Sequence, residues 1–467
     1  MNKKRIFISS VIITTAFIFS ACGSRTSEEP DGQGTGQSAV SALGADSPIE
    51  TKLQTEEQNV TDTQKEDSLM QTKVENLTEK AIQEICIDYA IQSYEDVQNF
   101  GYELFAQNIS DQNPVLSPVS AYLALSMAGC GADGATADEF VNVLGGMDVF
   151  SDDMMNHLPQ SGDFLTLSLA NSAWIDDEFI VDSEWLGTVK SLMHAEAFQA
   201  DLSTEDAMNS MNSWIAKQTN GMIDKMVENP LDAMSRLVLF DTLYFKGKWE
   251  TPFEAENTHT EAFYVNKQRN QTEQVEMMNL YWTYLDYIST DFAEGVILPY
   301  QNNPEEGVEP KLAFVALKPT GDGDIRDLYS KLTVENIKIL LLNRQNEMAH
   351  LKLPKFEVTF DKVLNNSLYN MGLTECFDDE KADFRKMGKT KSGYNLYISM
   401  VRQKAKIIVD EEGTEAAAVT EIDMRDGGVF MTDLKELYFN EPFLYMIMDM
   451  ERELPLFIGI MDNPKKQ

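Results

Sequence analysis

The residue types that most often perform acid–base, nucleophilic or metal chemistry are sparse in this chain of 467 residues. Its four histidines, His157, His194, His259 and His350, stand in unlike contexts. No His-Glu-x-x-His, Gly-x-Ser-x-Gly or phosphate-binding glycine motif is present. A catalytic triad assembled only in space would leave no such motif, but nothing in the sequence indicates one. We therefore expect a protein that is not an enzyme and holds no metal and no cofactor.

The four cysteines give no sign of redox or metal chemistry. Cys22 ends an apolar segment, and the others, Cys86, Cys130 and Cys376, are odd in number and lack metal-like or Cys-x-x-Cys spacing. A disulfide framework is not indicated. We interpret these three as small buried apolar side chains.

The stretch 409–420 is the most informative part of the chain. From Thr414 every second residue is small or apolar up to Met424, whereas Glu415, Glu421 and Asp423 fall in the intervening set. Because side chains of a strand alternate between its faces, the segment can lie in a sheet with one face on a core. An ordinary edge strand would show the same pattern. The continuation 426–433, with two glycines, is typical of an exposed loop, so the segment is predicted to have two possible states.

The run Glu411–Ala418 resembles the hinge of the reactive-centre loop of serpins, and further serpin-like blocks follow in the family's order. These blocks are 116–120, 131–136, 171–174, 243–249, 439–444 and 455–459. The likeness covers about residues 82 to 465. It implies an α+β serpin fold over 82–467, with eight to nine helices around three β-sheets and a reactive-centre loop at about 411–436.

The resemblance also implies a mechanism in which a serine or cysteine protease attacks the loop and forms an acyl-enzyme. The freed upstream segment then inserts into the main sheet and traps the protease. The hinge residues implied are Glu411, Gly413, Thr414, Glu415, Ala416, Ala417 and Ala418. A non-inhibitory serpin acting as a surface binding or carrier protein is the alternative, but such members usually have a hinge interrupted by proline or bulky charge. A ligand-binding lipoprotein of another class would leave the hinge unexplained.

The position of the cleaved bond is only approximately predicted. Family spacing from Glu411 points to Gly427-Gly428, and spacing from Phe439 allows Gly427 to Met431. Val429, Phe430 or Met431 would suit elastase- or chymotrypsin-like enzymes, and Arg425 a trypsin-like one. An elastase-like target is favoured.

Four further positions match the family's sheet-opening region, and two of them depart from its usual residues. The chain has Asp241 where serpins usually have asparagine and Gln403 where they usually have histidine, near serines matched by Ser117 and Ser120. The resemblance implies that the two changed positions hydrogen-bond to each other; since a carboxylate accepts and an amide donates, an Asp241–Gln403 bond is expected, although drift at two positions that do not touch is the alternative. Trp249 matches the family's tryptophan at the point where the loop first inserts.

The N-terminus is typical of a lipoprotein signal peptide. Lys3, Lys4 and Arg5 precede the apolar run Ile6–Ala21, which is short for a membrane span, and Cys22 follows as the expected lipidated residue. Residues 22–81 are polar and nearly free of aromatics, so we expect a disordered tether. The mature protein is expected outside the cytoplasm, lipid-anchored to the cell membrane and facing outward, or released.

The charge excludes several partners. With 38 basic against 76 acidic residues the net charge is −38, which repels nucleic acid, heparin and anionic membranes. The resemblance implies a protease as the partner, and we expect a monomer that touches the membrane only through its lipid.

Several elements follow from periodicity. Tyr102, Phe105 and Ile109 recur at helical spacing, and Met211–Gly221 reads as a helix with a glycine stop. Strands are predicted at 237–245, buried on both faces, at 395–409, leading into the hinge, and at 443–448 and 456–461.

Overall fold

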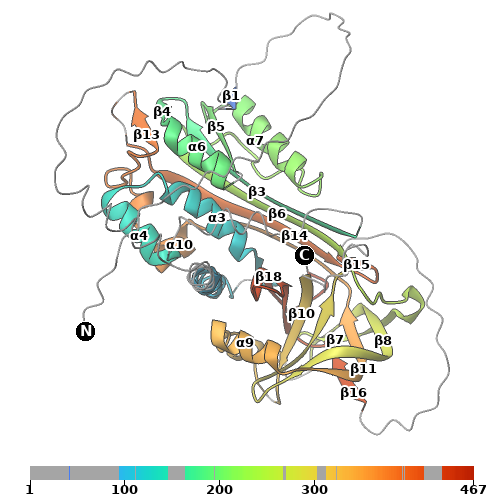
Figure 1. Ribbon diagram of the computed structural model, residues 1–467. Coiled ribbons are helices and arrows are strands. Elements are labelled where there is room, and N and C mark those ends of the chain that lie inside the picture. Colours follow the sequence, from blue (N-terminus) through green and yellow to red (C-terminus); the bar gives the residue numbers. More distant parts are fainter. Residues whose placement is uncertain are drawn as a thin grey trace, which may run out of the picture. The chain divides into compact units, whose positions relative to one another are not determined.

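The computed structural model describes residues 94–110, 112–145, 164–193, 195–266, 270–301, 312–321, 323–391, 393, 395–414 and 434–466, with the backbone of 41–42. This part of the chain contains eight helices and three sheets, as expected for an α+β serpin-type architecture (Figure 1). The helices are 94–106, α3 (Pro118–Gly129), α4 (Gly134–Leu144), α6 (Ser183–Leu192), α7 (Glu205–Gln218), α8 (Ile325–Tyr329), α9 (Val334–Leu342) and α10 (Asn365–Met371). Two 3-10 turns lie at Ala255–Asn257 and Glu375–Phe377.

The helix predicted over Met211–Gly221 is confirmed and begins earlier. Thr204 caps α7 by accepting from the Ala207 amide, and the chain leaves the helix through Gly221 at φ +79°. A positive φ favours glycine, which explains the stop.

The main sheet has seven strands in the order β1-β5-β3-β6-β15-β14-β12. Their bounds are β1 (Ser41–Ala42), β3 (Leu165–Asp176), β5 (Glu196–Ala200), β6 (Leu237–Lys248), β12 (Phe356–Val363), β14 (Ile398–Val409) and β15 (Gly413–Thr414). β6 and β14 also pair directly with each other, in parallel. β1 comes from the segment predicted to be a tether, and its two residues pair with the edge strand β5.

The second sheet has nine strands, and the third has two. The second runs β16-β11-β8-β9-β10-β17-β18-β2, with β7 paired to β8. Its strands are β2 (Val115–Leu116), β7 (His259–Tyr264), β8 (Thr272–Ser289), β9 (Ala293–Pro299), β10 (Leu312–Pro319), β11 (Arg344–Pro354), β16 (Lys435–Tyr438), β17 (Phe443–Asp449) and β18 (Leu454–Met461). The two-stranded sheet pairs β4 (Phe179–Val181) with β13 (Gly388–Thr390).

Strand boundaries correct the predictions by a few residues. The strand expected from Asn395 begins at Ile398, where pairing with Leu237 of β6 starts; the Asn395 side chain donates to the Ala382 carbonyl outside this sheet. The last strand begins at Leu454 rather than Leu456. At the other end of the expected loop, Lys435 and Glu436 already belong to β16.

β6 separates two apolar layers, which explains its burial on both faces. Leu237, Leu239 and Leu243 join the large core that includes α3, whereas Val238 and Phe240 join a smaller core with α7. Because side chains alternate along a strand, Asp241 must point to the α3 side. All residues of α3 are buried, so its first turn lies against the middle of this sheet.

Candidate functional site

The hinge predicted to insert after cleavage already begins inside the main sheet. In β15, Thr414 pairs with Val409 of β14 on one side and Gly247 of β6 on the other, and Gly413 pairs with Lys248. Thr414 is 1% exposed. The first two hinge residues therefore separate the ends of β6 and β14, while the rest of these strands stay paired.

Two glycines make this close approach possible. A Cβ on Gly413, whose φ is +158°, would lie 2.0 Å from the Gly247 carbonyl oxygen. A Cβ on Gly247 would lie 2.8 Å from the rings of Phe245 and Tyr300. Since real Cβ contacts are longer, a side chain at Gly413 would push β15 away from β6, and one at Gly247 would displace the rings of Phe245 and Tyr300.

Aromatic residues form the floor beneath the inserted hinge. Trp249 is buried, stacks on Tyr300 with ring centroids 4.8 Å apart, and donates from Nε1 to the Asp410 carbonyl at 2.9 Å. The Tyr300 hydroxyl bonds the Thr414 hydroxyl at 2.8 Å. The hydroxyl at position 414 therefore has a buried partner, and the ring of Trp249 supports the turn above it.

The turn between β14 and β15 is held by two acidic residues. Asp410 Oδ1 accepts from the amides of Glu412 and Gly413 at 3.0 and 3.2 Å. Glu411 accepts from Thr258 Oγ1 at 2.8 Å and forms an ion pair with Lys355 Nζ at 2.8 Å. Partial burial raises the pKa of the Glu411 carboxyl, but the bonds from Lys355 and Thr258 outweigh burial and the net shift is downward. For Asp410 burial dominates, and its pKa is raised.

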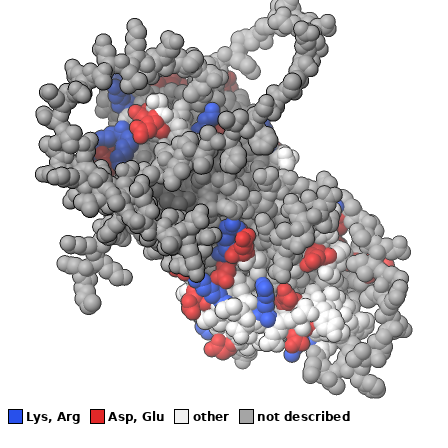
Figure 2. Space-filling view, viewed as in Figure 1, with Lys and Arg blue, Asp and Glu red and all other residues white. Residues whose placement is uncertain are grey.

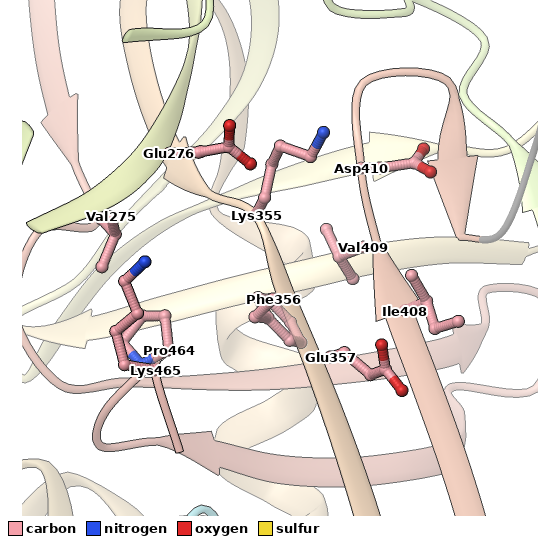
Figure 3. Close-up of a pocket in the computed structure, with 10 residues that line it drawn as sticks. All are labelled: Val275, Glu276, Lys355, Phe356, Glu357, Ile408, Val409, Asp410, Pro464 and Lys465. Atoms are coloured by element: carbon pink, nitrogen blue, oxygen red, sulfur yellow. The ribbon is translucent and has the colours of Figure 1, made fainter. Parts of the chain in front are cut away.

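A pocket of about 400 Å³ adjoins this turn (Figure 3). Figure 3 shows Asp410 in the tight turn that joins β14 to β15, with Lys355 between that turn and Glu276 of β8. The wall continues through Phe356, Glu357, Ile408, Val409, Val275, Pro464 and Lys465. The pocket thus lies beside the ion pair that anchors the hinge.

A second cluster joins β6, β14 and α3 farther along the same strands. Gln403 Nε2 donates to both carboxylate oxygens of Asp241, at 2.9 and 3.0 Å, and to the Ser117 carbonyl at 2.9 Å. The Ser117 amide donates back to Gln403 Oε1 at 2.9 Å. The expected Asp241–Gln403 hydrogen bond is therefore present, and Gln403 also bonds the α3 N-terminus, which the sequence did not predict. We call Asp241, Gln403 and Ser117 the seam lock.

The seam lock is fully buried and has no cation beside the carboxylate among the described residues. Asp241 and Gln403 are 0% exposed, and burial raises the pKa of Asp241 to about 7 although the amide of Gln403 opposes the shift. The Ser120 hydroxyl lies near Asp241 and acts to lower the pKa of this carboxyl. The hydroxyl makes no well-formed hydrogen bond in the described structure. Ser120 instead donates its amide to the Ser117 hydroxyl, which caps α3.

The structure brings together the predicted site residues that it describes and leaves the larger part of the predicted site untested. Glu411, Gly413, Thr414 and Trp249 meet at the hinge, and Ser117, Asp241 and Gln403 meet in the seam lock. The remaining predicted positions lie outside the described residues: Glu415, Ala416, Ala417, Ala418, Arg425, Gly427, Gly428, Val429, Phe430, Met431 and Cys22.

Four site residues were missed by the sequence reasoning, namely Thr258, Tyr300, Lys355 and Asp410. Tyr300 follows β9, and Lys355 stands between β11 and β12. Only Asp410 carried a local signal, because an aspartate before a glycine turn commonly accepts from the next amides.

The described part of the chain shows no cluster of three or more metal-ligating side chains. None of its helices is long and apolar enough to cross a bilayer. Of the cysteines predicted to be buried, Cys376 is buried, Cys130 is only half-buried, and Cys86 lies outside the described residues. Burial raises the pKa of the Cys376 thiol above the ordinary value.

Sequence comparison agrees with this architecture. The profile of the family Serpin (serine protease inhibitor) matches residues 95–464. An uncharacterised serpin-like protein of Thermococcus kodakarensis is 30% identical over 79% of this chain and 85% of its own length. The leukocyte elastase inhibitor of Xenopus tropicalis is also 30% identical, over 78% of this chain and 98% of its own.

Solved structures give the same result. The thermophilic serpin tengpin in its native state superposes with a TM-score of 0.72 at 30% identity, covering 83% of this chain and 95% of that one. Thyroxine-binding globulin, at 24% identity and a TM-score of 0.71, covers 81% of this chain and all of that one and shares the fold. The chain belongs to the serpin family, whose members are mostly protease inhibitors rather than enzymes.

Proposed function

We propose that this protein is a suicide-substrate inhibitor of serine-type, and in some cases cysteine-type, endopeptidases. The protease attacks the chain between Thr414 and Lys435 and forms an acyl-enzyme. The segment upstream of the cut then inserts between β6 and β14 before the ester is hydrolysed. About 14 residues at ~3.3 Å each would carry the bound protease through roughly 45 Å.

The observation that carries the proposal is the position of Gly413–Thr414 between β6 and β14. β6 and β14 are paired in parallel from Leu237 to Leu243, whereas each is antiparallel to its outer neighbour. A strand continuing β15 would be antiparallel to both. Insertion would replace one parallel ladder, the less stable kind per residue, with two antiparallel ladders, so the uncleaved fold can be trapped above its minimum.

The seam lock stands directly in the path of this insertion. Gln403 and Asp241 are paired residues of β14 and β6, so a strand between them must break their bond. The lock holds the seam closed until the hinge advances, and its strength helps set the threshold for premature opening.

The target is proposed to be an elastase-like protease. The bond candidates Gly427 to Met431 carry no charged side chain and include Val429 and Met431, and a relative named leukocyte elastase inhibitor supports this preference. Mass spectrometry of the cleaved chain locates the cut. A cut after Arg425 would replace this preference with a trypsin-like one.

The protein is further proposed to act as a monomer outside the cytoplasm, anchored by lipid on Cys22. The signal-like N-terminus and the acidity of the chain support this placement. Replacing Cys22 with alanine should shift the protein from the membrane fraction to the medium.

The test is incubation with pancreatic elastase, chymotrypsin, trypsin and subtilisin, followed by denaturing electrophoresis. A covalent complex that survives boiling in SDS, together with a large rise in the thermal stability of the cleaved chain, is expected. Clean cleavage by all four without a complex and without stabilisation would favour the alternative, a non-inhibitory serpin that binds or carries a ligand at the surface.

A further inference from the structure

A group of aromatic side chains on β8, β11 and β16 takes no part in the hinge or the seam lock. Trp282 and Tyr284 of β8 are 59% and 63% exposed. Ring contacts lead from Trp282 across the sheet: Trp282 to Tyr281 at 5.8 Å, Tyr281 to His350 at 4.5 Å, and His350 to Tyr438 at 5.1 Å between centroids. We call these five residues the aromatic face.

The backbone of β8 is bent to display this face. Trp282 has φ +50°, a conformation that is uncommon for a bulky residue. The register between β8 and β11 shifts at this point, so that His350 lies opposite the extra residue of a bulge. Such strain persists only where the surrounding structure imposes it, and it marks functional positions.

Within the aromatic face, the polar atoms of His350 and Tyr438 are bonded inside the sheet. His350 Nδ1 meets the Tyr438 hydroxyl at 3.1 Å, and its Nε2 meets Asn279 Oδ1 at 2.9 Å. Lys352 lies over the Tyr438 ring and is paired with Glu261. The exposed rings therefore offer mainly apolar area, and Figure 2 shows largely uncharged surface over this end of the second sheet.

The aromatic face is continuous with the strand that receives the end of the reactive segment. Thr283, Ala349 and Lys435 form one row across β8, β11 and β16, so Thr283 lies about 10 Å from Lys435. The bond candidates 425–431 stand four to ten residues before Lys435, within roughly 35 Å along an extended chain. A protease holding any of these bonds is therefore within reach of Trp282 and Tyr284.

We propose that the aromatic face is a secondary docking surface for the body of the target protease, outside its catalytic cleft. The inference rests on the proposed inhibitory function and concerns the selection of its target. Exposed tryptophan and tyrosine are the side chains that most often dominate binding interfaces, because they bury a large rigid area. The surface of the protease that would bind here is apolar and lies beside its catalytic cleft. The net charge of −38 disfavours a second copy or an anionic membrane as the occupant.

The test compares the wild type with the double variant Trp282→Ala/Tyr284→Ala. Its matched control is Tyr369→Ala/Leu342→Ala, which removes side chains of similar exposure, 56% and 82%, from α10 and α9. The probe is whichever of the four proteases named above the wild type traps fastest. We expect the association rate constant of the double variant to fall about tenfold or more, with an unchanged stoichiometry of inhibition, while the control keeps the wild-type rate. A free peptide of residues 411–436 lacks the aromatic face. The rate constant at which the protease cleaves this peptide therefore shows how fast the enzyme reacts with the segment alone.

A second measurement separates docking from trapping. The same protease with its catalytic serine changed to alanine binds the wild type reversibly, and the double variant should weaken that binding by a similar factor, with Trp282→Tyr restoring most of it. Equal rates and affinities for the double variant and the wild type would overturn the docking surface. Binding of the wild type to phosphatidylcholine vesicles, or a wild-type dimer, lost in the double variant would likewise overturn it. If the wild type forms no covalent complex, the proposed inhibition is refuted. The docking surface is still tested in that case, because the inactive protease either binds the wild type more tightly than the double variant or does not.

Discussion

The neighbouring strands β6 and β14 are joined by different contacts at the hinge and around Asp241. At the hinge end, β6 and β14 are already separated by Gly413 and Thr414, and the contacts are aromatic packing, short hydroxyl bonds and a partly exposed ion pair. Around Asp241, the same strands pair directly and are joined by a buried network that contains a carboxylate without a cation beside it in the described structure. One end is prepared for insertion, and the other resists it.

This difference assigns separate roles to neighbouring residues. Changes at the hinge end should alter whether the freed segment inserts in time. Changes at the seam lock should alter whether the sheet opens without cleavage. Four predictions test this separation.

The largest effect is expected from Thr414→Arg. Thr414 is buried and bonded to Tyr300, so an arginine there would place a charge in the sheet at a cost of several kcal/mol. The chain should fold but be cleaved as a substrate, with the stoichiometry of inhibition raised about tenfold or more. Val363→Arg, on an exposed end of β12, is the control and should inhibit normally. A variant at 414 that traps protease with wild-type stoichiometry would mean that this residue does not lead the insertion.

The second prediction concerns pH and Asp241. Its folded pKa of about 7 lies above the ordinary value of 3.8, so the folded state holds a proton that the unfolded state releases between about pH 4 and 7. Stability from this group is therefore present at pH 4 and is lost as pH rises through 7. Asp241→Asn should match the wild type near pH 4 and exceed it by about 4 kcal/mol at pH 8.

Denaturant titrations of both proteins at pH 4, 6 and 8 measure this difference. Other carboxyls, including Glu411 with its lowered pKa, titrate equally in the two chains and cancel. A pH-independent difference between the two proteins would show that Asp241 is ionised throughout.

The third prediction is that Gln403→Ala weakens the closed seam by about 3 kcal/mol, because it leaves Asp241 and the Ser117 backbone without partners. The temperature of spontaneous insertion or polymerisation should fall, as followed by native electrophoresis after heating. Arg402→Ala, which removes only the outer ion pair with Asp361, should cost less than about 1 kcal/mol. Unchanged heat stability of Gln403→Ala would show that the lock contributes nothing to closure.

The smallest effect is expected at Lys355. Its side chain is 31% exposed, so loss of the pair with Glu411 in Lys355→Ala should cost about 1 kcal/mol. A double-mutant cycle with Glu411→Gln measures the coupling by urea unfolding. A coupling near zero would leave the Asp410 turn and Tyr300 as the main anchors of the hinge.

The start of the hinge was predictable because its requirements are local. Alternation of small and charged residues predicted a strand-like segment, of which Gly413–Thr414 is described and is a strand, and Gly413 lies so close to the Gly247 carbonyl of β6 that a Cβ there would clash. The position of Thr414 was not predictable, since a segment able to enter a sheet gives no sign of how far it has entered. Lys355 and Tyr300 come from 56 and 114 residues away in the chain, as their separations from Glu411 and Thr414 show.

The sequence by itself determined the α+β class, the family resemblance, the long buried strand at β6 and the pairing chemistry of Asp241 with Gln403. The buried strand follows from periodicity, whereas the serpin-type fold and the pairing of positions 241 and 403 follow from the resemblance, together with the rule that a carboxylate accepts where an amide donates. Only the tertiary structure decided that Gln403 also bonds the start of α3, that the hinge is already seated, and that Trp282 reaches solvent beside the strand after the reactive segment. Those features depend on which strands become neighbours, and that is set by burial of the whole core rather than by any short stretch of chain.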